Sequence, residues 1–110
     1  MHNIIWNNSY GIFVISSSTN NEVYENNITT NDYGIYVASQ DCTANKFYYN
    51  NFINNTLHND SQAYDAGNNS WYISTSGNYW NEHISTDPYI IPPGINQDKY
   101  PLLSPRKWWL

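Results

Sequence analysis

Paired carboxylates would be the clearest sign of catalysis in this chain, which has nine Asp and Glu residues. Glycoside hydrolysis needs two carboxyl groups about 5–9.5 Å apart on either side of the scissile bond. In a repeat protein, such a pair would come from two acids one repeat apart. The residue 24 positions after Glu22 is Lys46, and the residue 24 positions after Asp32 is Thr56. The sequence therefore predicts a chain that is not itself an enzyme.

Aromatic residues make up 17% of the chain and are the second group that could bind a ligand. Exposed rings can stack on sugar rings, and a neighbouring carboxylate can accept hydrogen bonds from sugar hydroxyls. On this basis we expect a carbohydrate-binding surface formed by Trp71, Tyr72, Tyr64, Asp65, Tyr36 and Tyr48. The alternative is that these rings pair across neighbouring strands or seal a core, and the spacing leaves both open.

Metal ligands and basic residues are sparse. Copper sites use clusters of His, Met or Cys, but Met1, His2, Cys42, His58 and His83 are scattered without ligand spacing. We therefore predict no metal site and no cofactor. The chain has four Lys and Arg and a net charge of −5, which argues against nucleic acid as a partner. No apolar run is long enough for membrane insertion.

A repeat of about 23 residues organises the first half of the chain. The segment SYGIFV at residues 9–14 recurs as DYGIYV at residues 32–37, and NEVYENNI at residues 21–28 recurs as NKFYYNNF at residues 45–52. Apolar residues alternate within each segment, as in β-strands with one buried face. Short strands joined by Asn-rich corners predict an all-β fold, a right-handed parallel β-helix of about 2.5–3 turns with an irregular C-terminal cap.

The repeat offsets predict which residues stack from turn to turn. The expected inward columns are Ile12 with Ile35, Val14 with Val37, Val23 with Phe47, and Ile5 with Ile28 and Phe52. The expected Asn columns are Asn26 with Asn50, Asn27 with Asn51, and Asn8 with Asn31 and Asn55. In-register Asn residues can pass side-chain amide hydrogen bonds along a column. On the outside, we expect Phe13 to lie against Tyr36 and Tyr24 against Tyr48.

The repeats and three later elements resemble the NosD-like and carbohydrate-binding and sugar-hydrolase (CASH) β-helix family, found in surface proteins of methanogenic archaea. The elements are SGNYWN at residues 76–81, TDPYIIP at residues 86–92 and NQDKYPLL at residues 96–103. They are similar to the family's G-N-Y-W-S-D, D-T-P-Y-x-I-P and N-x-D-x-Y-P-L-M elements. The resemblance implies a parallel β-helix and places this chain at its C-terminal end.

The organisation expected from these patterns is repeats at residues 1–60, an irregular last turn and cap at residues 61–103, and a tail at residues 104–110 that extends beyond the cap. The N-terminal end has no cap, so self-association or an upstream domain there is a possible partner contact. The leading hypothesis is a non-catalytic structural or carbohydrate-interacting module, extracellular or on the cell surface, with a polysaccharide or surface glycan as partner. The alternatives are the C-terminal part of a β-helix polysaccharide hydrolase or lyase, and a copper-maturation accessory protein.

Overall fold

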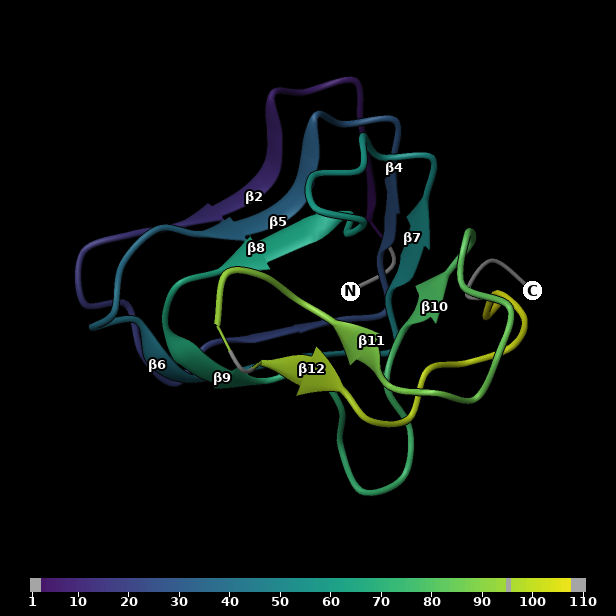
Figure 1. The fold of residues 1–110 in the computed structure, drawn as a ribbon. Coiled ribbons are helices and arrows are strands. Elements are labelled where there is room, and N and C mark those ends of the chain that lie inside the picture. Colours follow the sequence, from purple (N-terminus) through teal and green to yellow (C-terminus); the bar gives the residue numbers. More distant parts are fainter. Residues whose placement is uncertain (1–2, 95, 108–110) are drawn as a thin grey trace.

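The computed structural model describes residues 3–94 and 96–107, and within these ranges the regular structure is entirely β. Three parallel sheets run along one stack of coils (Figure 1). Sheet 1 contains β1 (Ile4–Trp6), β4 (Asn27–Thr29), β7 (Asn51–Ile53) and β10 (Tyr79–Trp80). Sheet 2 contains β2 (Tyr10–Val14), β5 (Tyr33–Val37) and β8 (Ala63–Asp65). Sheet 3 contains β3 (Glu22–Tyr24), β6 (Thr43–Tyr48) and β9 (Asn68–Ser70). The predicted all-β parallel solenoid of about three turns is confirmed.

The strand registers match the predicted inward columns. Ile28 pairs with Ile5 on one side and Phe52 on the other, and Val37 pairs with Val14. Val23 likewise pairs with Phe47. Burial increases from the first coil to the later ones: Ile5, in the first coil, is only partly buried, whereas Ile28 and Phe52 are fully buried. Burial of each large apolar side chain contributes about 1.5–3 kcal/mol.

At seven corners of the stack, a left-handed residue is directly followed by an Asn. Asn7, Thr30 and Asn54 have φ of 61°, 56° and 57° and directly precede the Asn column at the first corner. The pairs Glu25–Asn26, Tyr49–Asn50, Asn20–Asn21 and Ala44–Asn45 repeat this arrangement at the other two corners. Left-handed backbone turns the chain sharply, and Asn tolerates it better than most residues. Three of these seven left-handed residues, Asn7, Asn20 and Asn54, are Asn, so this tolerance accounts for part of the high Asn content.

Three ladders of amide side chains connect the coils. Ladder A contains Asn3, Asn26, Asn50 and Asn78; ladder B contains Asn8, Asn31 and Asn55, followed by Gln62; ladder C contains Asn21, Asn45, Asn69 and Asn96. The Asn31 main-chain N–H and Nδ2 both donate to Asn55 Oδ1, at 2.9 and 3.0 Å. The Nδ2 of Asn31 also donates to the Ile5 carbonyl, at 3.1 Å. These bonds satisfy amides that burial would otherwise leave unpaired.

The cap covers the C-terminal end of the stack with β11 (Tyr89–Ile90) and β12 (Gln97–Asp98), which pair antiparallel. The Tyr89 ring stacks on Trp80 with centroids 3.8 Å apart, and both side chains are buried. Asp98 ends ladder A by accepting the Asn78 main-chain N–H at 2.7 Å and Trp80 Nε1 at 2.9 Å. Trp80 seals this end of the core, whereas Tyr100 is 41% exposed.

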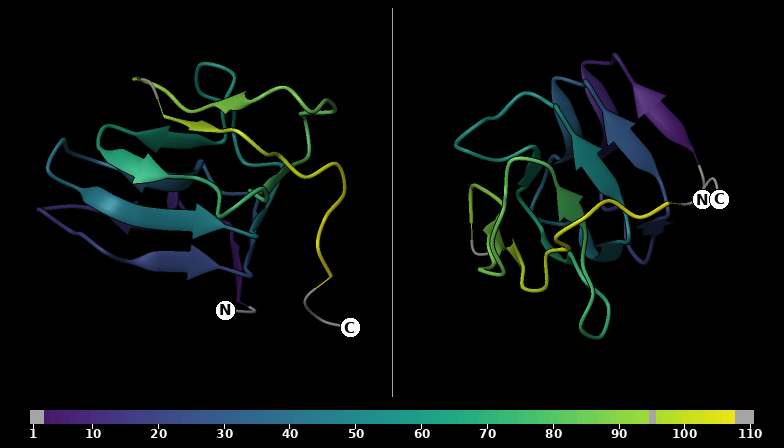
Figure 2. Two further views of the ribbon diagram at one scale, coloured as in Figure 1. Left: turned by 90° about the horizontal axis from the view of Figure 1, so that it is seen from below. Right: turned by 90° about the vertical axis from the view of Figure 1, so that its right-hand side faces the viewer.

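The described part of the tail does not extend beyond the cap, which corrects the prediction for residues 104–107. Figure 2 shows the segment after β12 running back along the stack toward the N-terminal end. Arg106 donates its main-chain N–H to Asn51 Oδ1 at 2.9 Å and accepts from Asn51 Nδ2 at 2.7 Å. Its guanidinium carbon lies 4.2 Å from the centre of the Tyr49 ring. The predictions for Trp108, Trp109 and Leu110 fall outside the described residues.

Candidate functional site

A polar groove runs along the corner between sheet 1 and sheet 2 and crosses three coils. Its volume is about 340 Å³. Each coil contributes residues from the same corner, so the lining repeats along the axis: Asn7, Asn8 and Ser9 from the first coil, Thr30, Asn31 and Asp32 from the second, and Asn54 and Thr56 from the third. Amide and hydroxyl groups dominate the lining, and Asp32 is its one charged side chain.

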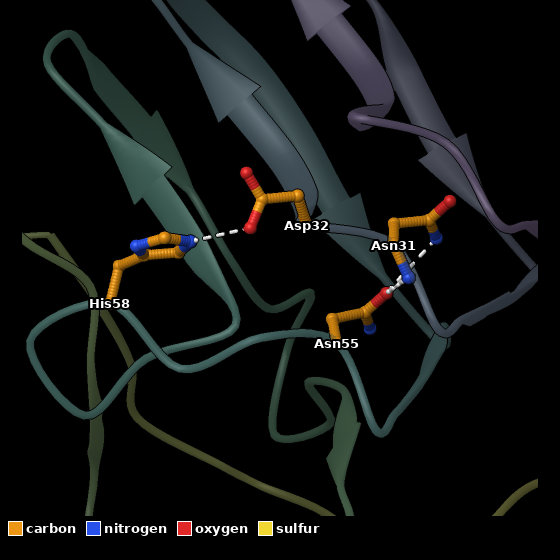
Figure 3. Close-up of polar contacts among 4 residues, drawn as sticks. All are labelled: Asn31, Asp32, Asn55 and His58. Carbon is orange, nitrogen blue, oxygen red and sulfur yellow. Dashed lines mark hydrogen bonds and ion pairs between the residues drawn. The ribbon is translucent and has the colours of Figure 1, made fainter.

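Asp32 of the groove lining pairs with His58, which comes from the next coil (Figure 3). His58 Nε2 lies 3.1 Å from Asp32 Oδ1, and the side chains are 33% and 54% exposed. A tight turn holds His58, because its main-chain N–H and carbonyl both bond to Ser61. The neighbouring Asn31 is fixed by its bonds to Asn55, so Asp32 projects from a rigid corner. An exposed pair of this kind adds little to stability, and its groups face solvent beside the groove.

Six rings cover the outer face of sheet 2 and the adjoining turn; we call this set the aromatic face. It consists of two columns, Tyr10–Tyr33–His58 and Phe13–Tyr36–Tyr64. Within the columns, Tyr33 and His58 stack with centroids 4.0 Å apart, and Tyr36 and Tyr64 stack at 4.5 Å. The columns meet edge to face, as between Tyr33 and Tyr36 at 4.8 Å and 78°. The first column borders the polar groove, because Tyr10 and Tyr33 directly follow groove residues.

The outward ring pairs predicted from the repeat are confirmed. Phe13 and Tyr36 have centroids 5.7 Å apart, and Tyr24 stacks on Tyr48 at 5.3 Å with planes 2° apart. Stacking covers the faces of the inner rings, so open ring faces are expected chiefly at the ends of the columns. Tyr10 and Phe13, in the first coil, are 42% and 47% exposed.

Two tyrosines of the aromatic face, Tyr33 and Tyr36, have a pKa above the ordinary tyrosine value. Burial, with a smaller contribution from the Asp32 charge, raises the pKa of Tyr33 above its ordinary value. Burial also raises the pKa of Tyr36, with help from Tyr64. Both hydroxyls therefore remain protonated at physiological pH and can donate hydrogen bonds.

Two of the six residues predicted to bind carbohydrate are in the core, so this part of the prediction is wrong. Trp71 and Asp65 are both fully buried. Trp71 packs on Phe47 with centroids 4.5 Å apart, and its Nε1 donates to Asp65 Oδ2 at 2.8 Å. The indole fills the core between Phe47 and Trp80, whose ring centroids lie 4.5 and 5.9 Å from its own. Burial raises the pKa of Asp65, opposed by hydrogen bonds from Trp71, Asn69 and the Gly67 N–H.

The other four predicted residues lie in three places. Tyr36 and Tyr64 belong to the aromatic face. Tyr48 is 8% exposed and donates its hydroxyl to Glu22 Oε1 at 2.7 Å; burial, strengthened by this bond, raises its pKa to about 12. Tyr72 is half-buried and meets Tyr100 edge to face. The structure therefore brings together only Tyr36 and Tyr64 as a surface.

Sequence reasoning missed the groove itself. The signal was available, because Ser9, Asp32 and Thr56 each follow a ladder Asn at a spacing of 23 or 24 residues. These polar residues differ in type. Only their common position, directly after a ladder Asn, indicates that they line the same groove.

A second depression of about 520 Å³ lies between the turn at Asn59 and Asp60 and the cap residues Glu82, His83 and Tyr89. It contains two acids, the feature sought for glycoside hydrolysis. However, both Glu82 carboxylate oxygens are engaged: Oε1 accepts from Gln62 Nε2 and Oε2 from the Tyr89 hydroxyl. Glu82 therefore anchors the cap to ladder B.

A family model described as "Periplasmic copper-binding protein (NosD)" matches residues 1–84. The chain belongs to the NosD family. No curated protein and no solved structure matches the chain. The periplasmic description of the NosD family is consistent with an extracellular or surface location. Within the described ranges, we find no helix with the length and hydrophobicity to span a membrane.

The described residues do not fit the copper site that the NosD description suggests. In residues 3–94 and 96–107, no three His, Cys, Asp or Glu side chains come together as a metal site. Cys42 is buried in the core, and His83 Nε2 lies 2.6 Å from the Asp87 carbonyl oxygen. Met1 and His2, which the sequence also offers as ligands, fall outside the described residues.

Proposed function

We propose that this NosD-family chain is a non-catalytic β-helix module that binds a neutral glycan along the polar groove, beside the first column of the aromatic face. One observation carries the proposal: a groove lined by amides and hydroxyls shares its border with a row of rings. Sugar-binding sites combine these two elements, since hydroxyls need polar partners and the apolar faces of sugar rings favour aromatic contacts.

The direction of the groove supports an extended ligand. It follows the axis of the coils, so equivalent polar groups recur at each coil. Coils in a parallel stack are about 4.8 Å apart, and successive units of a polysaccharide could therefore meet similar partners. The net charge of −5 disfavours acidic polysaccharides, which the protein's field would repel.

Binding without hydrolysis is favoured because Asp32 is the one carboxylate in the groove lining. A hydrolase would need a second acid on the opposite side of the bond. This module would act outside the cytoplasm, as a secreted or surface component.

Affinity electrophoresis with neutral and acidic polysaccharides tests the proposal. We expect at least one neutral polysaccharide to retard the chain, and Tyr10→Ala to weaken that binding at least threefold. Tyr100→Ala is the matched control, because Tyr100 is 41% exposed against 42% for Tyr10 but lies on the cap. Equal loss in both variants, or no retardation by any neutral polysaccharide, would contradict the groove assignment. Release of new reducing ends would contradict the non-catalytic role.

A further inference from the structure

A polar depression of about 460 Å³ lies where the cap meets sheet 3; we call it the sheet 3 pocket. The cap strand β12 runs beside β9 (Figure 1 and Figure 2), and the Asn69 main-chain N–H donates to Asn96 Oδ1 at 3.3 Å across this junction. The volume is within the roughly 300–1,000 Å³ of small-molecule sites. The lining residues are Asn68, Asn69, Ser70, Tyr72, Asn96, Gln97 and Lys99.

Hydrogen-bond donors that the fold does not use gather in this pocket. The amides of Asn69 and Asn96 belong to ladder C and donate to the chain's own carbonyl and carboxylate oxygens. Five other lining side chains make no hydrogen bond or ion pair within residues 3–94 and 96–107: Asn68, Ser70, Tyr72, Gln97 and Lys99. Each carries an N–H or O–H donor. The pocket can therefore donate several hydrogen bonds to one ligand.

The local charge of the pocket is opposite in sign to the chain's net charge of −5. Lys99 lines the pocket, and Lys46 lies on the preceding coil in register with Ser70. Both lysines are exposed. None of the described lining residues is acidic, and the adjacent Asp98 is fully buried and turned toward Trp80 Nε1. Two of the chain's four basic residues thus serve one site, which favours an anionic ligand.

The acid nearest to Lys46 in the sheet does not neutralise it. Glu22 is the register partner of Lys46 on the first coil. Its Oε1 accepts the Tyr48 hydroxyl at 2.7 Å, and no ion pair joins Glu22 to Lys46 in the described ranges. The ammonium group of Lys46 is therefore available to a ligand in the pocket.

Tyr72 adds an aromatic ring to these donors. It follows Ser70 on the outward side of the third coil and is half-buried. Among the described rings it contacts Tyr100, edge to face with planes 75° apart, unlike the stacked columns of the aromatic face. At least one face of the Tyr72 ring is therefore not covered by another ring. A ring beside hydroxyl and amide groups suits a sugar, which has both apolar faces and hydroxyls.

We propose that the sheet 3 pocket binds a sugar that carries one anionic group, a carboxylate or a phosphate. The anionic group lies against Lys99, and Lys46 adds charge from the preceding coil. The donors of Asn68, Ser70 and Gln97 meet the sugar oxygens. One anionic group suits the site better than a polyanion, which the rest of the chain would repel. The pocket lies on a different sheet from the polar groove, and the inference does not depend on glycan binding there.

Titration of the ¹⁵N-labelled chain with glucose 6-phosphate, glucuronate, glucose and inorganic phosphate tests the proposal. We expect at least one of the two anionic sugars to shift the amides of residues 68–72 and 96–99, and to bind about fivefold more tightly than glucose. The same sugar should bind more tightly than inorganic phosphate, because the ring and the amides contribute as well. The tighter of the two anionic sugars identifies the anionic group.

Three variants separate the contributions. Lys99→Gln should weaken binding of the anionic sugar about fivefold, since a close charge pair is lost. Lys107→Gln is the matched control, because it removes the same charge from an exposed lysine on the returning tail and should leave binding unchanged. Tyr72→Leu should weaken binding of the sugar but not of inorganic phosphate.

The proposal is overturned if neither anionic sugar shifts these amides, or if glucose or inorganic phosphate binds as tightly as the anionic sugars. Equal losses for Lys99→Gln and Lys107→Gln would also overturn it, because they would show an effect of net charge alone. Tyr10→Ala, which tests the polar groove, should leave binding in the sheet 3 pocket unchanged, so a failure at one site is distinguishable from a failure at the other.

Discussion

Asn50, in the middle of ladder A, is the position where substitution tests the amide ladders most sharply. Its side chain is fully buried, and Oδ1 accepts the Asn26 main-chain N–H and Nδ2 at 3.2 and 3.1 Å. Its Nδ2 donates to Asn78 Oδ1 at 3.1 Å and to the Val23 carbonyl at 2.9 Å. Asn50→Asp keeps the acceptor oxygen but turns the second oxygen against two acceptors. The variant therefore loses the two hydrogen bonds that Asn50 donates, while the side chain keeps nearly the same size.

The expected cost at pH 7 is about 3–5 kcal/mol, because two donated hydrogen bonds are lost and two buried acceptors remain, each worth about 1–3 kcal/mol. Protonation restores one donor, so the pKa of an Asp at position 50 must be higher in the folded chain than in the unfolded one. By linkage, the variant should regain unfolding free energy below about pH 4, where the introduced carboxyl is protonated in both states. It should lose that free energy as the pH rises through the folded-state pKa.

Urea unfolding at pH 4 and pH 7 measures this difference, with Asn3→Asp as the control. Asn3 lies at the exposed end of the same ladder, where water replaces the lost bond, so its substitution should cost no more than about 1 kcal/mol. Equal losses for Asn50→Asp and Asn3→Asp, or a loss at position 50 that does not change with pH, would refute the reasoning.

Burial raises the pKa of the Asp65 carboxyl, so the folded state favours the protonated form. The unfolding free energy of the parent should therefore fall relative to that of Asp65→Asn as the pH rises from about 4 to about 7, as measured by urea titration. Gly77→Ala should lower the melting temperature, because its Cβ would lie 1.8 Å from Asp98 Oδ1, whereas Gly94→Ala should leave it unchanged, since no atom lies within 4 Å. Thr30→Asn should add about 1 kcal/mol to the unfolding free energy, because Thr30 has φ of 56° and Asn tolerates that region better; calorimetry that finds no gain would contradict the corner argument.

The stacked coils could be predicted from the sequence because their contacts repeat at a fixed offset. Once SYGIFV and DYGIYV are aligned, the pairing of Ile12 with Ile35 and of Asn8 with Asn31 follows. Residues without a counterpart one repeat away could not be placed this way. Trp71 turns inward and packs between Phe47 and Trp80, and nothing in the local sequence shows this.

The cap and the tail were harder to predict for the same reason. The contact between Arg106 and Asn51 joins residues 55 positions apart. Asp98 resembles an ordinary surface acid in the sequence, yet it is fully buried and ends ladder A. Its burial raises its pKa, opposed by hydrogen bonds from Trp80 and Asn78. Part of the candidate site could be predicted from the sequence, because the ring columns follow the repeat. The groove could not, because it depends on left-handed corners. Asn7 and Thr30 occupy equivalent corners with the same backbone conformation but are different residue types.

Glycan binding along the groove is tested most directly by a chemical-shift map of the ¹⁵N-labelled chain with the neutral polysaccharide that retards it. We expect the perturbed amides to fall in residues 7–10, 30–33 and 54–58, which form the groove and its bordering ring column. Perturbations confined to the cap depression around His83, or spread without relation to the groove, would contradict the account.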